Sequence, residues 1–277
     1  MRRWLLILLC SLGLVGCGTK LVYDNLDWFA IQYVEDFVDL DNSQQTMLRQ
    51  SIQAATPWHR SQEIPIYINH LDQLLKINPS QLTVADLVEQ QETFRQHSLR
   101  LVEHFLPAIT NIVSDMSDEQ VEQLMDEIRV RHVKYKKKYQ SNSEQELRKL
   151  YRQRVEENLQ NWLGDLTQEQ QVLVEAWSQQ WLVTTPFWVE YQTQIRVELS
   201  KMFAERRNPE QLQALMRELL FRPQQYYPPQ LAARIDLNTQ IGQRYFVQII
   251  NLMTRKQTRN VKSELEDWRE IAMDLTL

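Results

Sequence analysis

Glycine is almost absent from this sequence, and its scarcity is the strongest constraint on the fold. Five of the 277 residues are glycine, against about 7% in an average protein. Tight hairpin turns and phosphate-cradling loops depend on glycine, because only glycine adopts their backbone angles without strain. Gln, Glu, Leu and Arg are abundant, and all four are good helix formers. The sequence therefore predicts an all-α fold, a multi-helix bundle with long antiparallel helical hairpins.

The N-terminus has the anatomy of a secretory signal. Arg2 and Arg3 precede an apolar run that ends at Val15. The run is shorter than the roughly 20 apolar residues that a membrane-spanning helix needs. We therefore interpret residues 1–16 as a cleaved signal peptide.

The end of this signal resembles a lipobox, the processing site of bacterial lipoproteins, at Leu14-Val15-Gly16-Cys17. The resemblance implies cleavage before Cys17 and covalent attachment of diacylglycerol and an N-acyl chain such as palmitate, with no other cofactor. Cys10 leaves with the signal, so Cys17 would be the only cysteine of the mature chain. The alternative is an ordinary secreted protein with a chance cysteine near its cleavage site.

The predicted lipid gives the chain a location. Two or more acyl chains anchor a protein stably, so no apolar stretch is needed elsewhere. Gly18 follows the cysteine, where lipoproteins retained in the inner membrane typically carry aspartate. We expect a protein anchored in the outer membrane and facing the periplasm, with the inner membrane as the less favoured location.

The rest of the chain reads as a tether at residues 17–22 and one all-helical domain at residues 23–277, with sub-boundaries near 114–117 and 222–229. The full sequence has a formal net charge of −5, which becomes −7 when Arg2 and Arg3 leave with the signal, and this acidic balance argues against nucleic acid as a partner.

Three helical features within this domain are predicted in more detail. A helix with the apolar stripe Val121, Leu124, Met125 and Ile128 should end near Tyr139. With a return helix from Ser143 to Gly164 it should form a hairpin about 30 Å long. Another helix should start at Thr167 and meet Pro186. A final long helix is expected over residues 230–274.

One short pattern recurs before predicted helices, at residues 40–44 (LDNSQ), 82–86 (LTVAD), 116–120 (MSDEQ) and 166–170 (LTQEQ). A hydroxyl or carboxylate at the N-cap accepts a free backbone N–H, and the side chain three residues later returns the bond. The simplest interpretation is a repeated helix start. The form Leu-Thr-x-x-Gln also resembles a motif of Spy/CpxP-type periplasmic chaperones, helical cradles for unfolded proteins, which implies a client-binding role.

A second resemblance rests on three segments: 23–28 (YDNLDW), 58–60 (WHR) and 64–67 (IPIY). Together with the lipobox, they look like a family of Gram-negative lipoproteins with a domain of unknown function. The similarity is concentrated in roughly residues 14–75. No catalytic residue is assigned in that family, so none is carried over.

One basic segment stands out, and its members are Arg129, Arg131, Lys134, Lys136, Lys137 and Lys138. Its simplest interpretation is a solvated hairpin tip, since cations also favour a helix C-terminus. Its functional interpretation is contact with anionic phospholipid, lipopolysaccharide or peptidoglycan.

Three tryptophans of one predicted helix form a possible stripe: Trp177, Trp181 and Trp188. A core stripe is the default interpretation, and a groove for a client protein is the alternative.

The titratable residues indicate no catalysis. The five histidines form no close metal pair, so no metal site is predicted. His59 and Arg60 form a polar junction that either binds an anion or caps a helix and pairs with Glu63. We therefore expect a non-catalytic envelope interaction or chaperone-like protein whose partner is an envelope protein, an unfolded client or peptidoglycan. The alternatives are a scaffold acting through residues 129–138 and an uncharacterised enzyme.

Overall fold

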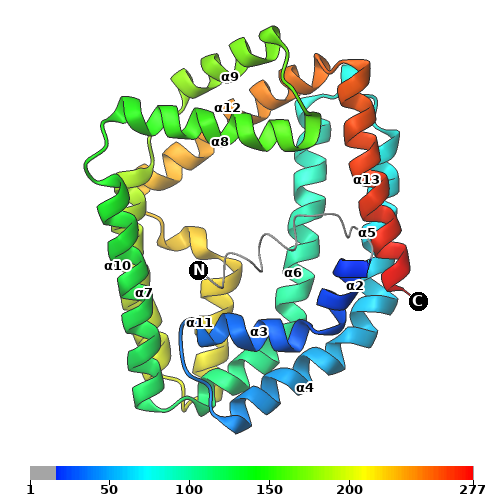
Figure 1. The fold of residues 1–277 in the computed structure, drawn as a ribbon. Helices are drawn as coiled ribbons and strands as arrows, with labels where there is room; N and C mark the ends of the chain where they lie inside the picture. The colour runs from blue at the N-terminus through cyan, green and yellow to red at the C-terminus, as the bar shows by residue number, and fades with distance from the viewer. Residues whose placement is uncertain (1–16, 277) are drawn as a thin grey trace. The chain divides into compact units, whose positions relative to one another are not determined.

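The computed structural model describes residues 17–276, and the predicted signal peptide at residues 1–16 lies outside them (Figure 1). All regular structure between residues 17 and 276 is helical, without a β-strand. The predicted all-α class is therefore confirmed. The chain divides into two compact units. Unit 1 contains the described residues up to Asp36, then Leu40–Ile77 and the stretch from Lys262; unit 2 contains Phe37–Asp39 and Asn78–Val261.

Unit 1 begins with the helix that carries Cys17. Its elements are α2 (Cys17–Asp24), α3 (Leu26–Glu35), α4 (Asn42–Trp58), the π-helix η1 (His59–Glu63), α5 (Ile64–Lys76) and the C-terminal part of α13 (Arg255–Leu275). The predicted tether at residues 17–22 is thus helical. Helix α3 packs on α4, and η1 joins α4 to α5 without a break in the helix. Pro57 lies inside α4, directly before the π-helix.

Unit 2 holds the middle of the chain. Its elements are η2 (Pro79–Gln81), α6 (Val84–Asp115), α7 (Asp118–Tyr139), α8 (Glu144–Leu163), α9 (Gln168–Gln180), α10 (Thr185–Ala204), α11 (Pro209–Phe221), η3 (Pro223–Tyr226), α12 (Pro229–Asn251) and the start of α13. Helix α8 packs on α9 and α9 on α12, while α6 packs on both α12 and α11. Helix α10 packs on α7, α11 and α12.

The structure corrects three predicted helical features. Helices α7 and α8 have the expected bounds, but α7 packs along α10 and α8 along α9, so the two do not form the predicted hairpin (Figure 1). The predicted final helix is two helices, because α12 ends at Asn251 and α13 begins at Arg255. The helix from Thr167 ends at Gln180, and a new helix begins at Thr185.

The recurring helix start is confirmed as a capping box in every copy. Asp41, Thr83, Ser117 and Thr167 each accept the backbone N–H three residues later, and the side chain there returns a bond to the cap. Thr254 and Gln257 make the same pair of bonds at the start of α13. Each cap satisfies donors that a helix N-terminus otherwise leaves free.

Two of these glutamines also connect distant parts of unit 2. Gln170 and Gln257 are 0% and 2% exposed. Each donates through Nε2 to the Oε1 of the other, at 3.1 and 2.8 Å. Gln257 also donates to the carbonyl of Asp165, just before the α9 start, at 2.8 Å. The two helix starts are therefore fastened to each other through a buried amide pair.

The helix starts joined by these contacts belong to an internal sequence repeat. Four segments recur in the same order, as 39–45 (DLDNSQQ), 56–58 (TPW), 78–82 (NPSQL) and 116–120 (MSDEQ), then as 165–171 (DLTQEQQ), 185–188 (TPFW), 208–212 (NPEQL) and 253–257 (MTRKQ). We call residues 39–139 the first half and residues 165–275 the second half.

Equivalent atoms make equivalent hydrogen bonds in the two halves. Gln120 donates to the carbonyl of Asp39 at 2.8 Å, as Gln257 does to Asp165. Gln45 donates to the carbonyl of Leu40 at 3.2 Å, and Gln171 to that of Leu166 at 3.3 Å. The last motif of each half thus closes on its first motif.

Helices of each half also pack on helices of the other half, and the contacts are reciprocal. Helix α11 of the second half packs on α6, and η2, its counterpart in the first half, packs on α12. Helix α7 packs on α10, and α13 contacts α5 through an Arg269–Asp72 ion pair of 2.5 Å. Each half therefore completes the packing of the other.

Candidate functional site

The basic segment of α7 contains two kinds of cation. Arg129 pairs with Asp126 at 3.0 Å, and Arg131 pairs with Glu127 at 2.9 Å. The Arg131 guanidinium also lies over the ring of Phe37, 3.9 Å from its centre. Both arginines are thus engaged locally.

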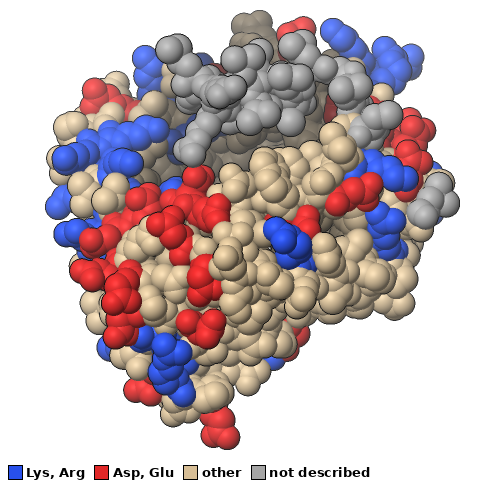
Figure 2. Space-filling view, turned by 60° about the horizontal axis from the view of Figure 1, so that its bottom comes forward, with Lys and Arg blue, Asp and Glu red and all other residues tan. Residues whose placement is uncertain are grey.

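The lysines of this segment differ from the arginines. All four are exposed and make no ion pair among residues 17–276: Lys134, Lys136, Lys137 and Lys138. Lys138 lies over the Tyr139 ring at 5.2 Å. The face drawn in Figure 2 carries both signs of charge and a broad uncharged area. The end of α7 therefore presents four exposed lysines that form no ion pair within the described part of the chain.

The three tryptophans do not form one stripe. Trp177 lies in the core on α9, stacked against Tyr245, in agreement with the default interpretation. Trp181 follows the end of α9 and stacks on Tyr151 with ring centres 4.3 Å apart. Trp188 lies on α10. Residues 181–184 are not helical and separate α9 from α10, so the three tryptophans do not share one helix.

The segments that carried the family resemblance converge on the π-helix of unit 1. Tyr23 of α2 hydrogen-bonds through its hydroxyl to His59 Nδ1 at 2.8 Å, and the two rings stack. Arg60 pairs with Asp24 at 2.8 Å and lies over the Tyr23 ring. The Tyr67 ring meets His59 edge-on. Arg60 thus has an ion-pair partner in Asp24 of α2, and the predicted pairing with Glu63 stays a prediction.

Burial sets the protonation of this cluster. It raises the pKa of the Tyr23 phenol, against the opposing effect of the Arg60 guanidinium. It lowers the pKa of His59, against the opposing effect of the Glu63 carboxylate. At neutral pH the imidazole and the phenol are therefore both neutral. A neutral hydrogen-bonded pair of this kind fastens α2 to the π-helix.

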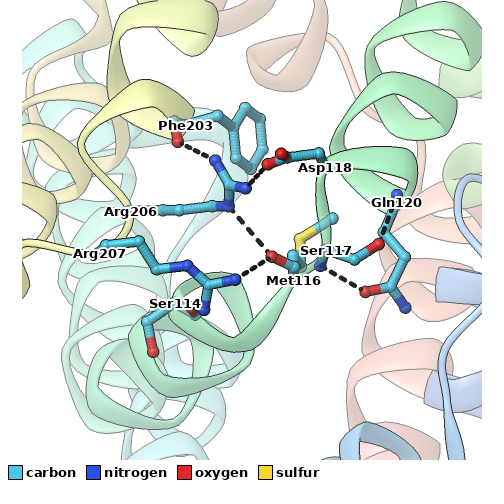
Figure 3. A network of polar contacts seen from close by, with 8 residues as sticks. All are labelled: Ser114, Met116, Ser117, Asp118, Gln120, Phe203, Arg206 and Arg207. Atoms are coloured by element: carbon cyan, nitrogen blue, oxygen red, sulfur yellow. Dashed lines mark hydrogen bonds and ion pairs between the residues drawn. The ribbon is translucent and has the colours of Figure 1, made fainter.

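A second polar network lies where α6 ends and α7 begins (Figure 3). Arg206 donates to the carbonyl of Met116 at 3.0 Å and pairs with Asp118. Arg207 donates to the carbonyls of Ser114 and Met116 at 2.6 and 3.2 Å. These carbonyls are among those that a helix C-terminus leaves unsatisfied. The guanidinium groups are committed to backbone atoms, so the network joins helices and leaves little for a ligand.

An open hollow of about 650 Å³ lies between the start of α8 and the end of α9 in unit 2. Its charged walls neutralise each other, since Arg148 pairs with Glu144, and Arg152 with Glu156 and Glu175. Within residues 17–276, no three His, Cys, Asp or Glu side chains are placed to hold a metal ion. Nor is any helix there both long and apolar enough to cross a membrane.

The comparisons with known proteins give one match. The model of a family of unknown function, DUF6279, matches residues 36–231. The chain belongs to this family. Searches of the curated proteins and of the solved structures find no match.

The extent of the DUF6279 match differs from the predicted similarity. It continues far beyond residue 75, and it leaves out α2, α3, most of α12 and α13. The matched region thus covers the first half of the repeat and the second half up to the start of α12, whereas α2 and α3 lie outside it.

Proposed function

We propose that this protein is a lipid-anchored, non-catalytic envelope protein of the outer membrane, facing the periplasm, that binds anionic envelope material through α7. The material is phospholipid, lipopolysaccharide or peptidoglycan. The observation that carries the proposal is the group of four exposed lysines at residues 134–138 without an ion-paired carboxylate. Cations near an anionic membrane surface each contribute about 1 kcal/mol.

Anchoring rests on the lipobox. Mass spectrometry of the native protein should find an N-terminus at Cys17 that carries three acyl chains. An uncut N-terminus or a free thiol at Cys17 would remove the anchor from the proposal.

Binding is tested by charge reversal. The variant K136E/K137E/K138E should bind anionic vesicles, lipopolysaccharide or peptidoglycan at least tenfold more weakly in low salt, and the wild-type affinity should fall as salt rises. The matched control is K76E/K149E/K262E, which changes the net charge equally at three exposed and separated lysines. Equal loss in both variants would mean that overall charge, and not α7, governs binding.

The chaperone-like alternative has less support. Trp177 lies in the core, and Gln170 of the Leu-Thr-x-x-Gln segment is fully buried. Neither side chain is available to a client while the domain is folded. Suppression of aggregation of an unfolded protein by the delipidated domain would restore this alternative.

A further inference from the structure

Helix α3 has an apolar face on the outside of unit 1. Its inner face packs on α4, where Ile31 is buried and Asp27 pairs with Arg49 at 3.7 Å and accepts from Gln53 at 3.0 Å. The outer face carries Leu26, Phe29 and Tyr33, at helical positions i, i+3 and i+7. A helix that is apolar on both faces normally lies in a core.

The exposed side chains extend over both N-terminal helices. On α2, Leu21 is 66% exposed and Val22 is also exposed. On α3, Trp28 is 51% and Tyr33 is 68% exposed, and the Trp28 and Phe29 rings meet edge-on with centres 4.8 Å apart. We call Leu21, Val22, Leu26, Trp28, Phe29 and Tyr33 the N-terminal apolar face. Several large apolar side chains exposed on two consecutive helices point to an interaction site.

The helix that precedes the second half provides an internal comparison. Helix α8 precedes the Asp165-Leu166 segment as α3 precedes Asp39-Leu40. Yet α8 exposes mostly amide and charged side chains: Gln145, Lys149, Gln153, Glu157 and Gln160. Its one large exposed apolar side chain is Trp162. The apolar outer face is thus a property of α2 and α3, and not of the position before an Asp-Leu segment of the repeat.

We propose that the N-terminal apolar face lies in the headgroup–acyl boundary of the membrane that holds Cys17. This inference rests on the proposed anchoring. Trp28 follows Cys17 by eleven residues, nearly all of them helical with a rise of about 1.5 Å each, so a lipid on Cys17 brings this face close to the bilayer surface. Tryptophan and tyrosine favour that boundary because their rings are apolar and their N–H or O–H groups polar.

The π-helix contacts hold α2 ready for this role. The Tyr23–His59 hydrogen bond and the Asp24–Arg60 ion pair fix α2 to the body of unit 1. An interface that is already ordered loses less conformational freedom on binding. The structure therefore assigns the cluster a positioning role, in which it aims the apolar face.

The test uses the full mature protein with mass-verified acylation, reconstituted into phosphatidylcholine vesicles that contain spin-labelled acyl chains. Trp28 emission should be quenched by the label and blue-shifted. Accordingly, Trp28→Phe should remove most of the quenchable emission. The matched control, Trp162→Phe, should leave the quenchable fraction unchanged, since Trp162 is comparably exposed on α8.

Each other outcome overturns the inference. If Trp28 is not quenched in acylated protein, the face does not contact lipid, while the proposed anchoring stands. A blue shift without quenching, together with a doubled mass in ultracentrifugation, would show that a second copy covers the face. A free thiol at Cys17 would overturn both the anchoring and this inference.

Discussion

The two halves of the repeat share their helix starts and differ in how the chain continues from them. In the first half, α4 runs through Pro57 into the π-helix His59–Glu63. In the second half, α9 ends at Gln180 and Pro186 opens a separate helix. Segment 78–82 begins a three-residue 3₁₀ helix, whereas segment 208–212 begins the thirteen-residue α11. The shared features are the helix starts and the hydrogen bonds that join the last motif of each half to its first motif, so they determine the fold. One differing feature, the π-helix, carries the His59 and Arg60 contacts that hold α2, and with it the N-terminal apolar face, to unit 1.

The buried amide pair provides the largest expected effect. Gln257→Leu removes a cap bond, the bond to Asp165 and the partner of buried Gln170. An unsatisfied buried amide and a lost cap together should lower the free energy of unfolding by about 3 kcal/mol. Chemical denaturation measures this change. Gln120→Leu is the matched variant of the first half and should have a smaller effect, because Gln120 is only partly buried. A larger effect at Gln120 would contradict the comparison.

The turn before the second Asp-Leu segment should require glycine, unlike that of the first half. Gly164 has φ +77° and ψ −149°, a region that is essentially open only to glycine. A Cβ there would lie 2.9 Å from Asn260 Nδ2. Gly164→Ala should therefore lower the free energy of unfolding by about 2 kcal/mol. Gly164→Asn should not rescue it, because asparagine tolerates a different, left-handed helical region. Thermal or chemical unfolding of both variants tests this point, and a neutral alanine would refute it.

The contact between α2 and the π-helix has no counterpart in the second half. Tyr23→Phe removes its 2.8 Å hydrogen bond and should reduce the local stability of α2 by about 1 kcal/mol. Hydrogen exchange of the α2 amides is the suitable measurement, with α8 amides as the reference. If α2 and α8 amides respond alike, the bond has no local role.

The smallest effect concerns pH. Burial lowers the pKa of His59 below its ordinary 6.5, with Glu63 in opposition. The unfolded chain therefore binds a proton more readily, so stability falls as pH decreases below about 6.5. Exchange of the α2 amides should accelerate over that range relative to wild-type exchange at pH 7, after correction for intrinsic rates. His59→Gln should abolish the dependence, while His132→Gln in unit 2 should retain it.

Local rules predicted most of the helix starts. A capping box involves residues three apart, so its sequence is sufficient to predict it at Asp41, Thr83, Ser117 and Thr167. The same rule was available for Met253-Thr254-Arg255-Lys256-Gln257, but apolar periodicity across residues 230–274 concealed the break. Pro186 similarly indicated a helix boundary, since proline disfavours a helical residue before it. The helical spacing of Trp177, Trp181 and Trp188 extended the stripe past that boundary.

The sequence by itself determined the helical class, the caps and the cationic segment, because each depends on residues that are neighbours along the chain. Only the tertiary structure decided that α7 packs on α10, that Gln170 meets Gln257 and that Tyr23 meets His59. Tyr23 and His59 are 36 residues apart in the sequence, and Gln170 and Gln257 are 87 residues apart. Periodicity tells which face of a helix is buried, but the choice of partner depends on competition among all such faces for burial, which no local pattern records.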